Sequence, residues 1–307
     1  MRCATAAISS RKTNPLIQSS ADQARDEDLR RDIETLLTDI DAELARPAPA
    51  GDGSDAGIEQ LKQCMSAPPF LAKAACGCAL PSPAVSVVMP TRNRASVIGE
   101  AIASVQAQSF TDWELIIVDD GSSDGTDSTI AAFESDPRIR YVAQAFSGHS
   151  AARNRALRQA RGTLVAYLDS DNLWYPNFLT AAVTVLRAYP DSDCIYGALD
   201  SKEHVEPPRT ILFEEFDRGR LLRENYIDLN TLVHRRALME THGGFDESLD
   251  RLVDWDLLLR FTQDKPARRV PVLAARYRVV DDQRVSVTRP HAPNFEAIRR
   301  KWHSEAS

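Results

Sequence analysis

The sequence predicts a Rossmann-like α/β layered domain with a mostly parallel central sheet, spanning residues 84–290. Strand-like apolar runs alternate there with helix-like periodic segments, and such alternation implies parallel strands joined by right-handed crossovers. Several predicted strands end in polar clusters, at the edge where an open α/β sheet binds its ligand. The 43% hydrophobic and 26% charged residues are typical of a soluble globular protein. An N-terminal helical extension precedes the domain, and residues 291–307 are predicted to form a C-terminal helix or tail.

The N-terminal extension divides into a tail, a helix and a linker. Residues 1–46 are predicted to form a disordered tail and then an amphipathic helix, which starts near residue 22. The apolar stripe of this helix, opposite an acidic face, consists of Leu29, Ile33, Leu36, Leu37, Ile40 and Leu44. Such a stripe must bury against the domain, a second copy or a partner, so helix 22–46 is a candidate for self-association or partner docking. Residues 47–83 are rich in helix breakers and predict a linker with a short helical segment.

The predicted elements of the domain follow one another closely. Runs rich in β-branched and other apolar residues predict strands at 85–89, 114–118, 139–142, 163–168 and 193–197. Apolar residues at helical spacing predict helices at 95–108, 127–134, 150–161 and 179–188. After Asp200 the elements become shorter and mixed, which suggests an appended substrate-binding half.

Composition excludes several classes of function. The net charge of −7 gives no sign of a basic face able to neutralise many phosphates, so we expect no nucleic-acid partner. No apolar run reaches the ~18 residues of a membrane-spanning helix, and the first residues lack the continuous apolar core of a signal peptide. These features predict a cytoplasmic protein and leave peripheral membrane association as an alternative.

The five cysteines are odd in number and scattered, at Cys3, Cys64, Cys76, Cys78 and Cys194. Free thiols in a reducing compartment fit this pattern better than a disulfide framework. The spacing of Cys64, Cys76 and Cys78 matches no standard zinc pattern, so a separate metal-binding module there is the weaker alternative.

Two carboxylates follow the predicted buried strand at 163–168. Asp169 and Asp171 are two residues apart, and in extended chain such side chains point to the same side. They can therefore converge on one divalent cation, Mn²⁺ or Mg²⁺, at the carboxyl edge of the sheet. A solvated acidic turn is the alternative reading of this segment alone.

Two further polar clusters follow predicted strands of the sheet. Residues 90–94 and 119–125 should share one cleft with Asp169 and Asp171, because the carboxyl ends of parallel strands lie along one edge.

Arg153 shares a helix face with apolar residues, so it should face inward, and a buried guanidinium suits a phosphate or carboxylate. An internal pair between Arg153 and a sheet-end aspartate is the alternative.

Asp254 lies near the start of a predicted helix, on one stripe with Leu257, Leu258 and Phe261. It should therefore face inward, at a position where a cleft could use it as a general base. Asp256 lies off that stripe and is spaced i, i+4 from Arg260, which predicts a surface ion pair. Acidic residues also favour helix N-termini for dipole reasons alone, so a purely structural Asp254 is the alternative.

Together these segments resemble the family 2 glycosyltransferases, which have the GT-A fold and typically invert the anomeric centre. The resemblance covers roughly two thirds of the chain, from about Pro83 to Ser286, and five ordered segments carry it. These segments are Val85–Arg94, Glu114–Ser122, Ser150–Asn154, Leu168–Asp171, and Gly243–Asp246 followed by Asp254–Asp256. Any one of them would be a weak signal, whereas their order makes a strong one.

The resemblance implies roles for individual residues. It implies that Asp254 is the catalytic base and that Asp169 and Asp171 bind a divalent metal with the donor diphosphate. It assigns nucleotide-sugar binding to Pro90, Thr91, Arg92, Asn93, Asp119, Asp120, Arg153, Asp169 and Ser170. Gly243–Asp246 would belong to the loop on the acceptor side.

The chain departs from the family pattern at four places. The family often has tyrosine where Arg92 stands, a further aspartate where Asn172 stands and glutamate where Val253 stands. Many members also have a metal-binding histidine near the end of the domain, and residues 277–284 contain none. Asp281, Asp282 or water could complete the metal shell instead.

The predicted function is a metal-dependent, inverting transfer of a sugar from a nucleotide-sugar donor, UDP-linked by default, to a hydroxyl acceptor. The acceptor would be a glycan, a lipid-linked saccharide or a protein. The departures from the family pattern leave a catalytically degenerate nucleotide-sugar-binding or scaffolding protein as one alternative. A nucleotidyltransferase is a weaker alternative, because the first loop at residues 90–93 has no glycine.

Overall fold

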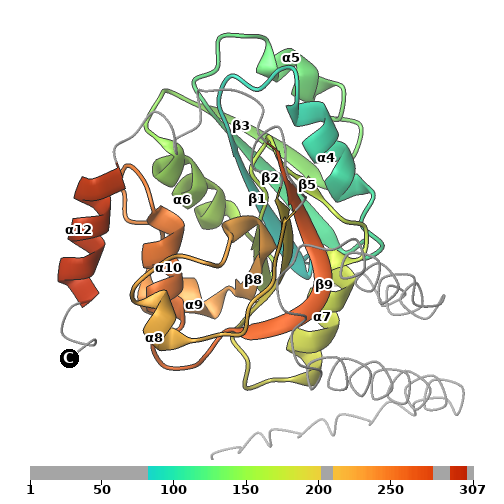
Figure 1. Ribbon diagram of the computed structural model, residues 1–307. Coiled ribbons are helices and arrows are strands. Elements are labelled where there is room, and N and C mark those ends of the chain that lie inside the picture. Colours follow the sequence, from blue (N-terminus) through green and yellow to red (C-terminus); the bar gives the residue numbers. More distant parts are fainter. Residues whose placement is uncertain (1–81, 202–209, 279–290, 303–307) are drawn as a thin grey trace, which may run out of the picture.

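The computed structural model describes residues 82–201, 210–278 and 291–302 (Figure 1). The predicted N-terminal tail and helix, nearly all of the predicted linker, and four of the five cysteines lie outside the described residues. So do Asp281 and Asp282, the proposed substitutes for a metal-binding histidine.

The first half of the sheet is parallel, as predicted. Its strands are β1 (Val85–Thr91), β2 (Trp113–Asp120), β3 (Ile139–Gln144) and β4 (Leu164–Tyr167), in the spatial order β3-β2-β1-β4. All three pairings are parallel. Every residue of β2 and β4 is buried, because parallel strands in an α/β domain are covered on both faces. The near-continuous apolar runs of the sequence follow from this burial.

The second half of the sheet mixes strand directions. It contains β8 (Leu232–Arg235), β6 (Cys194–Ser201), β9 (Arg268–Tyr277) and β5 (Leu173–Trp174), in that order beyond β4. β7 (Thr210–Leu212) pairs with β6 at the side. The β6–β9 pairing is parallel, whereas β4–β8, β6–β8 and β5–β9 are antiparallel. The described residues thus form a mixed α/β domain built around a largely parallel sheet.

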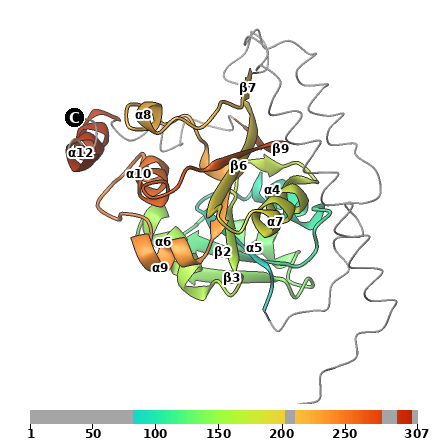
Figure 2. The same ribbon diagram turned by 90° about the horizontal axis from the view of Figure 1, so that it is seen from below.

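Helices cover both faces of the sheet (Figure 2). One face carries α4 (Ile98–Gln106), α5 (Thr126–Ala131) and α7 (Phe178–Ala188). The other carries α6 (His149–Gln159), α9 (Ala237–His242) and α10 (Val253–Phe261). Neighbouring residues of β1 alternate between these layers: Val87 and Met89 pack in one core cluster and Val88 in the other. No helix in the described part of the chain combines the length and apolar character needed to cross a membrane.

The last helix, α12 (His291–Trp302), packs against α10. The ring of Phe295 stacks on that of Trp255 with 5.3 Å between centroids, and Ile298 and Trp302 are buried. Two further short helices are α8 (Arg218–Leu221) and the 3₁₀ helix η1 (Leu229–Thr231), whose three residues are all buried. The helix α12 therefore contributes Ile298 and Trp302 to the core.

The predicted ion pair between Asp256 and Arg260 is present, but it is buried and not at the surface as predicted. Asp256 is 0% exposed; its carboxylate accepts a hydrogen bond from Arg260 Nε at 3.0 Å and lies 2.8 Å from Lys301 Nζ. The guanidinium of Arg260 also donates to the backbone oxygens of His242 and Gly244. Helical phase within α10 placed Asp256 off the Leu257 stripe, but it could not reveal that α12 supplies Lys301 and covers this side of the helix.

Replacing Asp256 by asparagine should lower the free energy of unfolding by about 3 kcal/mol, because two cations lose their shared buried partner. Urea denaturation followed by circular dichroism measures this change. Asp264→Asn is the matched control, since the Asp264 side chain is 75% exposed and its loss should change stability by less than about 0.5 kcal/mol. Equal effects of the two substitutions would contradict the structural role of Asp256.

Candidate functional site

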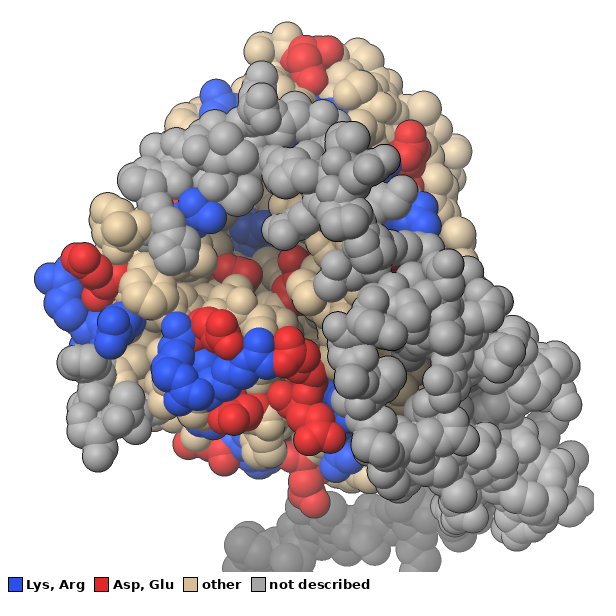
Figure 3. All heavy atoms as spheres, in the orientation of Figure 1, with Lys and Arg blue, Asp and Glu red and all other residues tan. Residues whose placement is uncertain are grey.

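A pocket of about 610 Å³ opens at the carboxyl ends of the parallel strands. Its walls come from the loops after β1 and β4, the end of β2, the start of α6, residues 225–230 and residues 247–254. The space-filling view shows a hollow in this face of the molecule with acidic and basic side chains at its walls (Figure 3). Of the predicted site residues, all but Asp119 line this pocket: Pro90, Thr91, Arg92, Asn93, Asp120, Arg153, Asp169, Ser170, Asp171 and Asp254.

The loop after β1 forms one wall. Asn93 has a left-handed φ of 51°; its N–H donates to Ser122 Oγ and its Oδ1 accepts from the N–H of Ser123. These bonds join the β1 loop to the β2 loop. Thr91 is buried, and its Oγ1 has no hydrogen-bond partner within the described ranges, so a donor or acceptor is left for a ligand.

Arg92 and Phe146 form a flat surface at the edge of this wall. The Arg92 guanidinium lies over the Phe146 ring, 3.9 Å from its centroid. Phe146 is 54% exposed, which is unusual for a large apolar side chain. Arg92 stands where the family often has tyrosine. The aromatic ring at this edge of the pocket is instead that of Phe146, from the segment before α6. The sequence prediction did not include Phe146, because a single phenylalanine in a loop carries no local signal of a ligand contact.

The two aspartates that end β2 contact protein groups. Asp119 lies outside the pocket lining and accepts hydrogen bonds from the N–H of Ser122 at 2.8 Å and from Tyr141 Oη at 3.0 Å. Asp120 lines the pocket and accepts from the N–H groups of Ser147 and Gly148 at 2.7 and 2.8 Å. Asp120 therefore anchors the segment that carries Phe146 and leads into α6.

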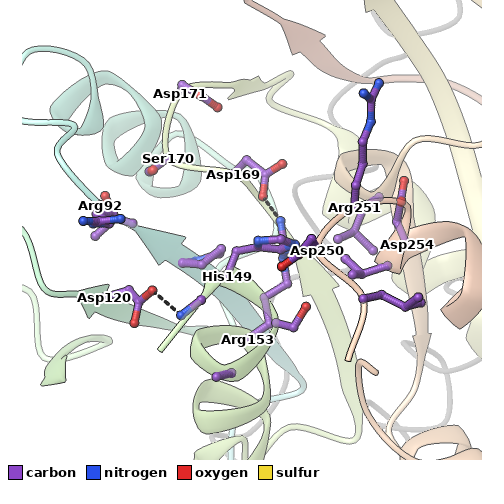
Figure 4. A pocket seen from close by; sticks show the side chains of 18 of the residues that line it. Arg92, Asp120, His149, Arg153, Asp169, Ser170, Asp171, Asp250, Arg251 and Asp254 are labelled. Atoms are coloured by element: carbon purple, nitrogen blue, oxygen red, sulfur yellow. Dashed lines mark hydrogen bonds and ion pairs between the residues drawn. The ribbon is translucent and has the colours of Figure 1, made fainter. Parts of the chain in front are cut away.

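The loop after β4 holds the two predicted metal carboxylates, and each is paired with an arginine. Arg153 Nη2 donates to Asp169 Oδ1 at 2.5 Å (Figure 4). Arg94 Nε donates to Asp171 Oδ2 at 3.3 Å. The Arg153–Asp169 pair is the internal pairing considered as an alternative above. Arg278 Nε donates to the backbone oxygen of Asp171 at 2.6 Å, which fixes this loop to the end of β9.

Asp169 and Asp171 fit a divalent cation that completes its shell on a diphosphate. Burial and the nearby charge of Asp169 raise the pKa of Asp171, so the pair carries repulsion that a cation would relieve. Mg²⁺ and Mn²⁺ commonly take one or two protein carboxylates and fill the shell with water and phosphate oxygens. No cluster of three or more His, Cys, Asp or Glu side chains suited to a metal occurs among the described residues. These two carboxylates are the ligands that this part of the chain would offer.

Asp254 lies on the opposite wall from Asp171 (Figure 4). Burial raises the pKa of Asp254, while Asn225 Nδ2 donates to its Oδ2 at 2.8 Å. The residue that caps α10, Leu252, has a left-handed φ of 62°. Leu252 and Asn93 are the two non-glycine residues with positive φ in the described ranges, and both line the pocket. Such backbone strain is concentrated at functional sites.

Residues 225–230 form a wall that the sequence prediction left unassigned within a long loop region. Asn225, Asp228 and Asn230 line the pocket, and Asn230 Oδ1 accepts from the N–H of Asp169 at 2.7 Å. Burial and the charges of Asp169 and Asp254 raise the pKa of Asp228 to about 6. The signal that the sequence offered here was the mixture of polar Asn225, Asp228 and Asn230 with Tyr226, Ile227 and Leu229.

Comparison with solved structures identifies the class of fold. The first 349 residues of Staphylococcus aureus TarS, in complex with UDP-GlcNAc, superpose with a TM-score of 0.62 at 21% identity, covering 72% of this chain and 66% of that one. A mannosyltransferase of Pyrobaculum calidifontis, in complex with GDP-Man and Mn²⁺, gives a TM-score of 0.52 at 21% identity over 91% and 81% of the two chains. The fold is that of the GT-A glycosyltransferases.

Sequence comparison identifies the family. Residues 86–240 match the model of "Glycosyl transferase family 2", and the chain belongs to this family. An uncharacterized protein, y4gI of Sinorhizobium fredii, is 32% identical over 71% of this chain, a match that spans 25% of its own length. The Escherichia coli UDP-Glc:alpha-D-GlcNAc-diphosphoundecaprenol beta-1,3-glucosyltransferase WfgD is 39% identical over 71% of this chain and 83% of its own.

Proposed function

We propose that this chain transfers a sugar from a nucleoside-diphosphate sugar to a hydroxyl group of an acceptor, with inversion, in glycan or polysaccharide synthesis. Family membership supports the reaction class. UDP is the favoured nucleotide, because WfgD is named for UDP-Glc and the TarS structure contains UDP-GlcNAc. The proposed acceptor is a lipid-linked saccharide, as in the name of WfgD, or another glycan or a protein.

One observation carries the proposal: the aspartate pair after β4 and Asp254 on α10 face the same pocket from opposite walls. A diphosphate near the pair and an acceptor near Asp254 would therefore bring the anomeric carbon between leaving group and nucleophile. The carboxylate of Asp254 takes the proton of the acceptor hydroxyl as its oxygen attacks that carbon. The bond from carbon to diphosphate oxygen breaks, and the diphosphate leaves with the electron pair. A single displacement of this kind inverts the anomeric centre.

The proposed donor end of the pocket combines negative and positive side chains. A divalent cation held by Asp169 and Asp171 would supply charge neutralisation to the diphosphate. Arg94 and Arg153 bring guanidinium groups to the same end of the pocket, and guanidinium groups suit phosphate oxygens. Thr91, Arg92 and Phe146 are proposed to contact the nucleoside, with the exposed ring as a stacking surface.

A panel of nucleotide sugars tests the proposal. UDP-glucose, UDP-GlcNAc and GDP-mannose are added with and without Mn²⁺, and the melting temperature is recorded. A donor present at about 100 times its Kd should raise the melting temperature of the protein by roughly 5 °C or more. Release of nucleoside diphosphate from the stabilising donor then reports turnover. Stabilisation without release, with saccharide acceptors present, would favour a binding protein of degenerate catalytic function, and no stabilisation by any donor would contradict the proposal.

A further inference from the structure

Asp228 presents one carboxylate oxygen to the pocket. It caps η1, and its Oδ1 accepts hydrogen bonds from the backbone N–H of Asn230 at 2.8 Å and from Asn230 Nδ2 at 2.7 Å. No hydrogen bond or ion pair engages its Oδ2 in the described part of the chain, and Asp228 lines the pocket and is half-buried. One oxygen thus holds the local fold, and the other remains available to a ligand.

Hydrogen bonds on either side of Asp228 connect its segment to the two ends of the proposed reaction site. Asn230 bonds Asp228 through Nδ2 and accepts the N–H of Asp169 through Oδ1, so η1 is fastened to the loop of the aspartate pair. Three residues before Asp228, Asn225 donates to Asp254. The segment 225–230 therefore runs from the proposed diphosphate end of the pocket to the proposed base, with Asp228 between the two contacts.

We propose that Asp228 accepts a hydrogen bond from a hydroxyl group of the transferred sugar and thereby helps to select the donor. This assignment rests on the proposed function: with the diphosphate near Asp169 and the acceptor near Asp254, the sugar ring lies between them. An ionised carboxylate only accepts hydrogen bonds, and sugar hydroxyls are donors. Charge-assisted bonds of this kind are stronger than neutral ones, so their loss is measurable.

The substitution Asp228→Asn should remove the proposed hydrogen bond to the sugar and keep the cap of η1. Asp228→Asn keeps an Oδ1 acceptor for Asn230 and replaces Oδ2 by an NH₂ donor of similar size. Asp217→Asn is the matched control, because Asp217 caps α8 by accepting from the N–H of Arg220 at 2.9 Å and does not line the pocket. The control should leave every affinity unchanged.

Calorimetric titration with Mn²⁺ present compares each nucleotide sugar with its nucleoside diphosphate: UDP with UDP-glucose and UDP-GlcNAc, and GDP with GDP-mannose. For the donor that the wild type binds, Asp228→Asn should weaken affinity at least about tenfold and leave that of the free diphosphate unchanged. Equal weakening of both would show a purely structural cap, and no change in either would show no contact. Both outcomes overturn the assignment while the proposed function stands.

Monodeoxy analogues of the donor sugar supply a second readout, and its first arm uses only the wild-type protein. One monodeoxy analogue of the bound donor sugar should lose the same factor of about ten in affinity. Asp228→Asn should then bind that analogue and the parent sugar equally, as a closed double-mutant cycle requires. If every analogue binds the wild type like the parent, the assignment is wrong. A wild type that binds free diphosphates but none of the nucleotide sugars would contradict the proposed function itself.

Discussion

Asp254→Asn is expected to lower turnover by about 10³-fold, because asparagine cannot take a proton from the acceptor and a general base typically contributes ~10²–10⁴-fold. Donor affinity should stay unchanged, since Asp254 lies across the pocket from the aspartate pair. Steady-state release of nucleoside diphosphate gives kcat, and calorimetry gives the donor Kd. A lower kcat with an unchanged donor Kd identifies a catalytic base, whereas a weaker donor Kd would identify a binding residue.

The structural neighbourhood of Asp254 requires a control for misfolding. Asn225 donates to Asp254 Oδ2, and the carboxamide of the variant retains one oxygen that can accept this bond. Asp264→Asn, an exposed change beyond the end of α10, should leave kcat and Kd as in the wild type. Full activity of Asp254→Asn would mean that another group takes the proton, with Asp228 the next carboxylate to examine.

Asp171→Ala is expected to abolish the Mn²⁺ dependence of nucleotide binding. In the wild type UDP should bind more tightly with Mn²⁺ than with EDTA, because the proposed cation is shared between the aspartate pair and the diphosphate. Removal of one of the two carboxylates should bring the ratio of the two Kd values close to one. Calorimetric titration of UDP under both conditions measures this ratio without any turnover.

Arg94→Met is the matched control for Asp171→Ala. Both substitutions break the ion pair between Arg94 Nε and Asp171 Oδ2, but Arg94→Met leaves both carboxylates in place. For Arg94→Met, the ratio of the Kd values for UDP with EDTA and with Mn²⁺ should stay as large as in the wild type. An undiminished ratio in Asp171→Ala would exclude Asp171 as a metal ligand.

Local pattern predicted the parallel half of the sheet and the inward-facing Arg153. Strands β1, β2 and β4 are buried on both faces, so their apolar runs were visible in the sequence. The phase of α6 was sufficient to place Arg153 inward, where it is buried and lines the pocket. Phase was not sufficient for α10, in which Asp254 is half-buried and lines the pocket whereas Asp256, off the predicted stripe, is 0% exposed. The catalytic and binding roles of these residues remain predictions that the proposed experiments test.

Long-range contacts limited the rest of the prediction. The start of β9 is rich in arginine and contains Pro271, so its strand character depends on pairing with β6 and β5 rather than on its own pattern. The involvement of Asp119 with Tyr141, and of Asp256 with Lys301, depends on partners from other elements. Phe146 reaches the pocket because Asp120 anchors the segment that follows it.

The order of elements along the chain has a consequence for synthesis of the protein. The face of β4, β6 and β8 that bears Tyr167, Tyr196 and Leu232 belongs to the core cluster containing α9, α10 and α12, and these helices come last in the chain. During translation this apolar face stays uncovered until α9, α10 and α12 have left the ribosome. Incomplete chains would thus expose sheet surface that favours aggregation, so nascent molecules should depend on chaperones until the last helix docks.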